Sequence, residues 1–271
     1  MALNTGYFYG RIVEQPKFYV KDSIPRKCVL SVSTFARFRN SQKSDDVRYD
    51  VITVMTENPE MMEYVRGNLR EGDMVHIKGM VCTADIRRKC VCGKCEQEFR
   101  DLGYTCYIHP IHICKGESGV SEERGKQLLA ENKELSNEIY LDAHVCTNVT
   151  YSPEYKAASY KVAVKRPFYI QEDPVDKKVD YPAVNTYYEQ AESDGKHLHP
   201  GSRMIVKGSI RVRSIEKNVA CPFCGNTEPR KINILEVVAS HIGYIGDWDK
   251  PEDFENQDAP SIQINTDIPM M

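Results

Sequence analysis

The chain has 271 residues, of which 41% are hydrophobic, and its formal net charge is −3. This composition excludes a wholly disordered protein, and the length accommodates one or two folded domains. The apolar runs are far shorter than the roughly 20 residues that span a bilayer, so no membrane helix is expected. The first residues carry neither a basic segment nor an apolar stretch, and we therefore expect no secretory signal and a cytoplasmic location.

The first 115 residues predict a small β-barrel. Asn58 and Pro59 are typical of a helix start, and Gly72 ends the helix that follows. Apolar alternation and β-branched residues predict strands around that helix, at 7–14, 28–35, 48–55, 74–86 and 107–114. Three strands, a helix and two strands form the order of OB folds, which are Greek-key barrels that bind oligonucleotides on one face.

A repeated segment predicts that the chain contains two such barrels. Residues 72–79, GDMVHIKG, return as GSRMIVKG at 201–208, and each copy continues as a strand into a C-x-x-C pair. This spacing is that of a whole small domain and is too long for a solenoid repeat. The second copy predicts strands at 140–150, 159–165, 179–188, 204–215 and 232–245, with a short helix near 189–194.

We therefore predict an all-β chain of two tandem OB folds whose last hairpins carry cysteines. The expected organisation is a first OB fold at 1–115, a linker with a short helix at 116–138, a second OB fold at 139–246 and a tail at 247–271. The tail holds seven acidic residues and one Lys, a charge of −6, which leaves +3 on the rest of the chain. It lacks apolar periodicity and is expected to be disordered.

The two C-x-x-C pairs predict zinc binding, because such a turn directs two thiolates toward one tetrahedral Zn²⁺. The pairs are Cys92 with Cys95 and Cys221 with Cys224. Either the two hairpins share one four-cysteine site, within a chain or between chains, or the first hairpin completes its own site with Cys90 or Cys106. A redox dithiol is the less favoured reading, because it needs a βαβ context that is absent here. The other four, Cys28, Cys82, Cys114 and Cys146, are expected to be buried in strands.

The first half resembles bacterial single-stranded DNA-binding proteins. The resemblance is carried by GRIVEQP at 10–16, by the strand at 30–39 that ends in Phe-Arg, by YDVITV at 49–54, and by residues 63–79 with their Lys-Gly turn. The second half is similar mainly through 201–208. The resemblance implies OB folds, binding of single-stranded DNA, and assembly of four OB folds, which two copies of this chain would supply as a homodimer.

The last residues, Asp267, Ile268, Pro269, Met270 and Met271, are similar to the family's acidic tail, which ends in Asp-Ile-Pro and an apolar residue. The family's terminal aromatic residue is absent here. An acidic peptide with an apolar tip suits a hydrophobic groove with a basic rim. The resemblance therefore implies that the tail binds replication and recombination proteins.

Single-stranded DNA requires cations for its phosphates and flat rings for its bases. Phe38 and Tyr49 are the leading stacking candidates, because each adjoins arginine and lies where the family places stacking aromatics. Tyr187 and Tyr188 are weaker candidates. The full predicted set of DNA-binding residues is Arg37, Phe38, Arg39, Arg48, Tyr49, Arg87, Arg88, Lys165, Arg166, Phe168, Tyr169, Arg211 and Arg213.

The sequence thus predicts a protein that coats single-stranded DNA independently of its sequence, in replication, recombination and repair, and that acts without catalysis. Its expected place is the bacterial nucleoid, or the host cytoplasm if a plasmid or phage encodes it. A replication or conjugation accessory factor that acts mainly by binding proteins is the alternative. A zinc- or thiol-dependent enzyme is the least favoured, because the sequence has no Walker loop and no Ser-His-Asp arrangement.

Overall fold

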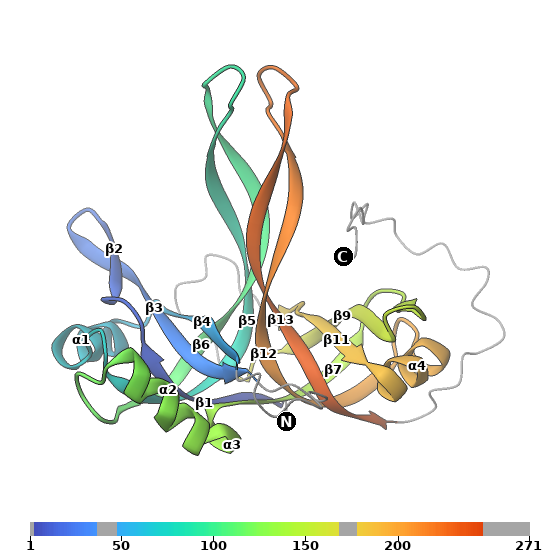
Figure 1. Cartoon of the computed structure of the whole chain (residues 1–271), viewed down its shortest axis with the longest axis horizontal. Helices are drawn as coiled ribbons and strands as arrows, with labels where there is room; N and C mark the ends of the chain where they lie inside the picture. Colours follow the sequence, from blue (N-terminus) through green and yellow to red (C-terminus); the bar gives the residue numbers. More distant parts are fainter. Residues whose placement is uncertain (1–2, 37–47, 168–177, 246–271) are drawn as a thin grey trace.

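The computed structural model describes residues 3–36, 48–167 and 178–245. Its strands form one continuous 13-stranded sheet, which curls into two barrels that lie side by side (Figure 1). The elements of the first half are β1 (Asn4–Ile12), β2 (Lys17–Lys21), β3 (Ile24–Ala36), β4 (Arg48–Thr56), α1 (Pro59–Asn68), β5 (Met74–Val91) and β6 (Glu98–Lys115). Two helices follow, α2 (Glu122–Glu131) and α3 (Lys133–Ser136). The second half comprises β7 (Asn137–Val145), β8 (Thr150–Ser152), β9 (Ala157–Lys165), β10 (Val179–Asp180), β11 (Ala183–Tyr187), α4 (Tyr188–His197), β12 (Arg203–Ala220) and β13 (Thr227–Ile245).

The first barrel is closed by five strands. β1 pairs with both β3 and β5, β3 pairs with β4, and β5 pairs with β6, all antiparallel. The parallel pairing of Val54 in β4 with Ile108 in β6 closes the ring. α1 lies between β4 and β5 in the chain, begins at Asn58, whose side chain accepts a hydrogen bond from the Met61 N–H, and buries Met62 and Val65.

The second barrel repeats this closure strand for strand. β7 pairs with β9 and β12, β9 with β11, and β12 with β13. The parallel pairing of Val184 in β11 with Val237 in β13 closes the ring. The prediction of OB-type barrels is therefore confirmed, and α4 occupies the position that α1 has in the first copy.

The barrels are joined through their first strands. β1 and β7 pair antiparallel from Asn4 with Leu141 to Phe8 with Asn137. Each of these strands carries a buried asparagine whose amide bonds to both backbone groups of one residue in its own barrel: Asn4 to Val81 and Asn137 to Ile210. One hydrophobic core runs through both barrels, from Phe8 and Ile12 to Val206 and Ile242.

Three local features can be compared with the expectations from the sequence: the last hairpins, the helix of the second barrel and the linker. The last hairpins are longer than expected, because β5–β6 and β12–β13 continue their pairing well beyond the barrels as polar two-stranded ribbons. α4 extends to His197, because Asp194, at the end of its expected span, is buried and accepts hydrogen bonds from the hydroxyls of Tyr160 and Thr186. The linker helix is present as α2, which buries Leu128 and Leu129 against the barrel, followed by the single turn of α3.

The expected burial of four strand cysteines is half right. Cys28 and Cys82 are buried, whereas Cys114 and Cys146 are exposed. Cys114 occupies an outward-facing position of β6, and Cys146 lies just beyond the end of β7, so neither side chain reaches a barrel interior. Among the helices of the described residues, none is long and apolar enough to cross a membrane.

Candidate nucleic-acid interface and metal centre

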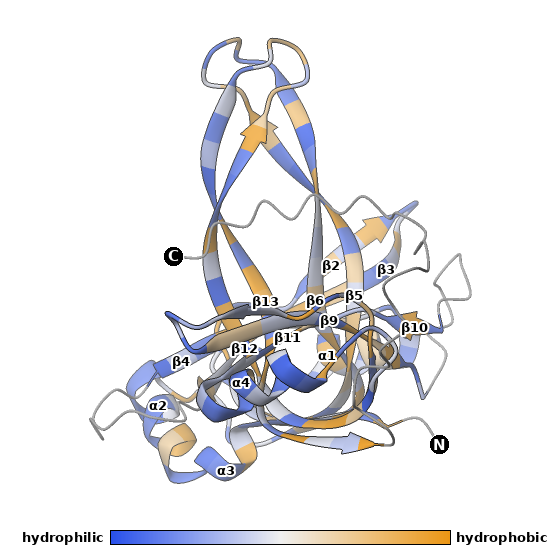
Figure 2. Ribbon diagram, turned by 90° about the vertical axis from the view of Figure 1, so that its right-hand side faces the viewer, coloured by the Kyte–Doolittle hydropathy of each residue, from blue (hydrophilic) through white to orange (hydrophobic). Residues whose placement is uncertain are grey.

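The two long hairpins stand side by side and form a rod that projects from the barrels (Figures 1 and 2). Contacts between them run along its length. Lys217 of β12 pairs with Asp101 of β6 at 2.9 Å. Near the tip, the Glu228 carboxylate of β13 accepts a hydrogen bond from the Gly93 N–H at 2.6 Å, and Arg230 donates to the Val91 carbonyl. The rod therefore holds the two hairpin tips together.

Each tip is a tight C-x-x-C turn. Backbone hydrogen bonds close the turns from the Glu96 N–H to the Cys92 carbonyl and from the Gly225 N–H to the Cys221 carbonyl. Glu96 and Gly225 take equivalent left-handed conformations, with φ of 57° and 70°. The two turns thus share one geometry, which directs the cysteine pairs of both hairpins toward each other.

The four tip cysteines form one cluster, in which all Sγ atoms lie within 4.8 Å of one another. The Cys92 and Cys224 sulfurs are 3.6 Å apart, and those of Cys95 and Cys221 are 3.7 Å apart. A tetrahedron of thiolates bound to zinc at about 2.3 Å has S–S edges of about 3.8 Å. The shared arrangement within one chain is therefore the one that the structure contains. Cys90 and Cys106 lie outside the cluster.

The cluster gives two of its thiols, Cys92 and Cys95, very different pKa values. Hydrogen bonds from the backbone N–H groups of Cys95 and Lys94 lower the pKa of Cys92 to about 6. The Gln97 N–H acts in the same direction on Cys95, but burial and the sulfurs of Cys224, Cys92 and Cys221 outweigh it and raise the pKa of Cys95 to about 12. One thiolate forms readily, and a complete set of four needs a cation to offset their mutual repulsion.

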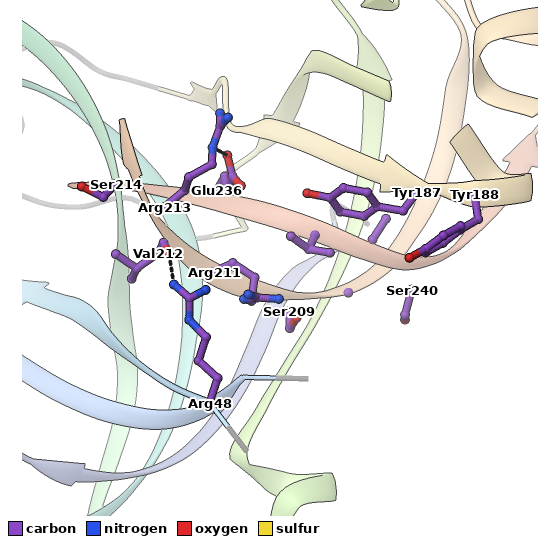
Figure 3. Close-up of a pocket in the computed structure, with 13 residues that line it drawn as sticks. Arg48, Tyr187, Tyr188, Ser209, Arg211, Val212, Arg213, Ser214, Glu236 and Ser240 are labelled. Atoms are coloured by element: carbon purple, nitrogen blue, oxygen red, sulfur yellow. Dashed lines mark hydrogen bonds and ion pairs between the residues drawn. The ribbon is translucent and has the colours of Figure 1, made fainter. Parts of the chain in front are cut away.

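A groove of about 720 Å³ lies on the second barrel at the base of the rod (Figure 3). Its walls come from β12, β13 and the junction of β11 with α4, where Tyr187 and Tyr188 stand exposed. The first barrel contributes Arg48, which reaches across from β4 toward β12. The full lining is Arg48, Tyr187, Tyr188, Gly208, Ser209, Arg211, Val212, Arg213, Ser214, Glu236, Val238, Ala239 and Ser240.

Carboxylates fix the three arginines of the groove. Asp50 of β4 pairs with Arg211 at 2.9 Å and with Arg48 at 3.2 Å, and Glu236 pairs with Arg213 at 3.1 Å. Burial raises the pKa of Glu236, while Arg213 and Arg211 act against that rise. The side chains of Arg48 and Arg213 remain 51% and 37% exposed, so each can present N–H groups to a phosphate while its carboxylate partner holds it in place.

Tyr188 has an unusual backbone. Its φ is 59°, a left-handed value that is uncommon for a residue with a side chain, and its N–H bonds to the Lys156 carbonyl at 2.6 Å. This conformation ends β11 abruptly and lets two consecutive tyrosines line the same groove (Figure 3). Strain of this kind gathers at functional sites.

The other predicted DNA-binding residues are dispersed. Arg37, Phe38, Arg39, Phe168, Tyr169 and the terminal Asp267–Met271 lie outside the described residues. Lys165 is exposed at the end of β9, Arg87 is exposed on the rod, and Arg88 lies 3.7 Å from Asp101.

Tyr49 and Arg166 lie in environments that the sequence did not indicate. Tyr49 is half-buried under α2, where its hydroxyl donates to the Lys126 carbonyl at 2.9 Å and its ring meets Phe35 edge-on. Arg166 is buried against Asp180 at 2.5 Å, with 2% of its side chain exposed. Of the predicted set, Arg48, Arg211 and Arg213 are the residues that the structure brings together, in the groove of the second barrel.

Sequence reasoning did not include Asp50 and Glu236, which position the groove arginines. One signal for Asp50 was present: DVITVMT at 50–56 matches DYPAVNT at 180–186 in its Asp, Val and Thr. Glu236 had no such signal, because its first-half counterpart in the hairpin register is Tyr107.

Comparison with known proteins finds similarity to single-stranded DNA-binding proteins, in sequence for the second barrel and in fold for nearly the whole chain. Residues 136–244 match the single-strand binding protein family. The wild-type single-stranded DNA binding protein from Thermus aquaticus is 14% identical, with a TM-score of 0.50 over 90% of this chain and 94% of that chain. A deletion mutant of the Thermus aquaticus protein is also 14% identical and gives a TM-score of 0.51 over 93% and 98% of the two chains. At this identity the two structures show a shared fold.

No curated protein matches the sequence. The fold likeness extends over nearly the whole chain, whereas the family match covers the second barrel. The second barrel is thus similar to the single-strand binding protein family in sequence, and the first barrel shares its closed five-stranded fold.

Proposed function

We propose that this protein binds single-stranded DNA without sequence preference and coats and protects it during replication, recombination and repair. The observation that carries the proposal is the groove on the second barrel, which combines three arginines with two exposed tyrosines. Stacking of a base on an aromatic ring contributes about 1–3 kcal/mol whatever the base is. Arginine adds salt-dependent contacts to phosphates. The groove has the chemistry of a binding site, and we propose no catalytic step.

The four-cysteine cluster at the rod tip is proposed to hold one structural zinc ion. Its support is the donor set of four sulfurs, their separations of 3.6 and 3.7 Å, and the two matched turns that present them. Four thiolates leave no open coordination position, which is typical of a structural rather than a catalytic site. Zinc there would fasten the two hairpins of one chain to each other.

Three further features belong to the proposal. The terminal segment that ends in Asp267–Met271 recruits replication and recombination proteins, supported by its acidic charge and apolar tip. Two chains associate into a homodimer with four OB folds. The protein works in the cytoplasm, where its DNA substrate lies.

The test is equilibrium binding of the purified protein to labelled oligo-dT and to a duplex of the same length, over a series of salt concentrations. We expect tight binding to the single strand, weak binding to the duplex, and a loss of affinity with salt whose slope is about 0.7 per phosphate contacted. Arg213→Gln should lower that slope by about 0.7.

Arg203→Gln is the matched control, because Arg203 lies on the same strand, β12, and also pairs with a carboxylate, that of Asp142 at 2.7 Å, outside the groove. Its salt slope should equal that of the wild type. Equal affinity for single strand and duplex would refute the proposal and favour a factor that binds mainly proteins.

A further inference from the structure

The two barrels can be aligned residue by residue through their contacts. Asp50 in β4 and Asp180 in β10 are equivalent, and each accepts a hydrogen bond from a backbone N–H of the other barrel's long hairpin. Val212 donates to Asp50 at 3.1 Å, and Thr83 donates to Asp180 at 2.7 Å. Val54–Ile108 and Val184–Val237 are the matching parallel pairs of the two barrels. Ile108 of β6 therefore corresponds to Val237 of β13, and the residues on either side correspond in order.

This alignment shows that, among the residues the structure describes, the charged groove of the second barrel has no equivalent in the first. Arg211, Arg213 and Glu236 correspond to Cys82, Ala84 and Tyr107. Cys82 and Tyr107 are buried with Met80 in a separate apolar cluster, against which Ala84 packs. Where the second barrel presents charged side chains to a groove, the first is closed and apolar.

A fourth residue difference contributes to the closure. Ala36 pairs with Arg48 in the first barrel, and the equivalent position in the second barrel is Arg166, whose N–H bonds to the Lys178 carbonyl. Arg166 reaches the carboxylate of Asp180, and the side chains of this ion pair are 2% and 0% exposed. Ala36 has no side chain that could reach Asp50, and Asp50 instead holds the groove residues Arg48 and Arg211.

The ion pair lies over the first barrel. Asp180 accepts hydrogen bonds from both the N–H and the hydroxyl of Thr83 in β5. Burial, and then the charge of Arg166, lower the pKa of His109 to about 4, which places Arg166 beside β6. His109 is the counterpart of Val238 in the open groove. Arg166, held by Asp180, thus lies beside the first barrel at a position where the second barrel has only the short side chain of Ala36.

What remains in the first barrel is a smaller cleft of about 410 Å³, on the side of α1. Its described lining residues include His109, His112 and Tyr64, and none of those described is Lys or Arg. The described lining residues of this cleft supply no Lys or Arg for the phosphates of a strand, in contrast to the three arginines of the larger groove.

We propose that the duplication is functionally unequal: single-stranded DNA is held in the groove of the second barrel, and Arg166, held by Asp180, fills the corresponding place at the first. The inference rests on the proposed function and narrows it, because each chain then offers one DNA groove and not two. A base stacks on Tyr188 or Tyr187 while Arg48 and Arg213 contact the phosphates.

Two matched variants test the inference without disturbing the core. Tyr188→Asn removes an exposed ring from the open groove, and asparagine tolerates the left-handed backbone there. His112→Asn removes an exposed ring from the smaller cleft of the first barrel. Affinity for oligo-dT should fall on the order of 10-fold in Tyr188→Asn, in keeping with the loss of one stacked base, and should stay within about twofold of the wild type in His112→Asn.

Photo-crosslinking of the wild-type protein to bromodeoxyuridine-substituted single strands gives an independent readout. Crosslinked peptides should come from residues 183–190, 208–214 and 236–240. Equal crosslinking of residues 57–64 and 109–113, or an equal loss of affinity in the two variants, would overturn the inference while leaving DNA binding intact. Failure of the wild type to bind oligo-dT would instead sink the proposed function itself.

Discussion

Removing the proposed zinc ion from the rod tip should raise the number of reactive thiols per native chain from two to six. The chain has 10 cysteines, and four of them form the tip cluster. Four others, Cys28, Cys82, Cys90 and Cys106, are buried at 5% exposure or less. Cys114 and Cys146 are exposed and should react at once with an aromatic disulfide reagent.

The physical reason is that thiolates bound to zinc are poor nucleophiles, whereas free thiolates attack disulfides readily. Cys224 is exposed and Cys95 is partly exposed even within the cluster. Once a chelator takes the metal, no bond joins the two turns at their sulfurs. The turns then separate more easily, and Cys92 and Cys221 come within reach of the reagent. Cys28, Cys82 and Cys106 lie in the barrels, away from the tip, and should stay protected. Cys90 lies on the rod, and we expect it to stay buried because the β5–β6 ribbon keeps its pairing.

The assay is thiol titration with parallel measurement of released zinc by a chromophoric chelator, before and after chelation and then in denaturant. The expected thiol counts are two, six and ten, with one zinc per chain. A Cys114→Ser/Cys146→Ser double variant should give zero, four and eight with the same zinc content. Reaction of six thiols while the chain still holds its zinc, or no change upon chelation, would refute the reasoning.

Two predictions concern stability, each measured by urea unfolding. Asn137→Ala should lower the free energy of unfolding by about 2–5 kcal/mol, because the buried N–H and carbonyl of Ile210 lose their partners; a loss below about 1 kcal/mol would contradict this account. His109 has a folded pKa of about 4 against an ordinary 6.5, so the unfolded chain binds the extra proton and stability falls as the pH drops between these values. His109→Gln should lose less stability than the wild type between pH 7 and 4.5, and an identical decline would count against the assignment.

The sequence was sufficient to predict the barrels because its patterns are local. Alternating strands, the Asn58–Pro59 helix start and the repeated glycine-bounded segment each report on nearby backbone. The cysteine pairs also predicted the tip cluster, since a C-x-x-C turn has one dominant geometry. The choice between a shared site and two separate sites depended on whether the hairpins run side by side, which is a tertiary property.

The groove was less predictable, because its composition depends on contacts between the halves. Arg166 and Arg211 look alike in the sequence as basic residues beside strands, yet one is buried in an ion pair and the other lines a groove. The two arginines differ in the place where a carboxylate holds them. Asp180 holds Arg166 in a buried ion pair, whereas Asp50 of β4 holds Arg211 at the groove. Tyr49 likewise looked like an exposed stacking residue until α2, which is remote in sequence, was found to cover it.

The joined hairpin tips have a consequence for the unfolded chain. Cys95 and Cys221 lie 126 residues apart in sequence. A link that persists between them would close a loop of that size and lower the entropy of the denatured ensemble by the equivalent of about 5 kcal/mol at 25 °C. Such a tether would keep the two halves at high local concentration when either one opens. Re-pairing of β1 with β7 would then be a search within a closed loop and would not require the ends of a free coil to meet.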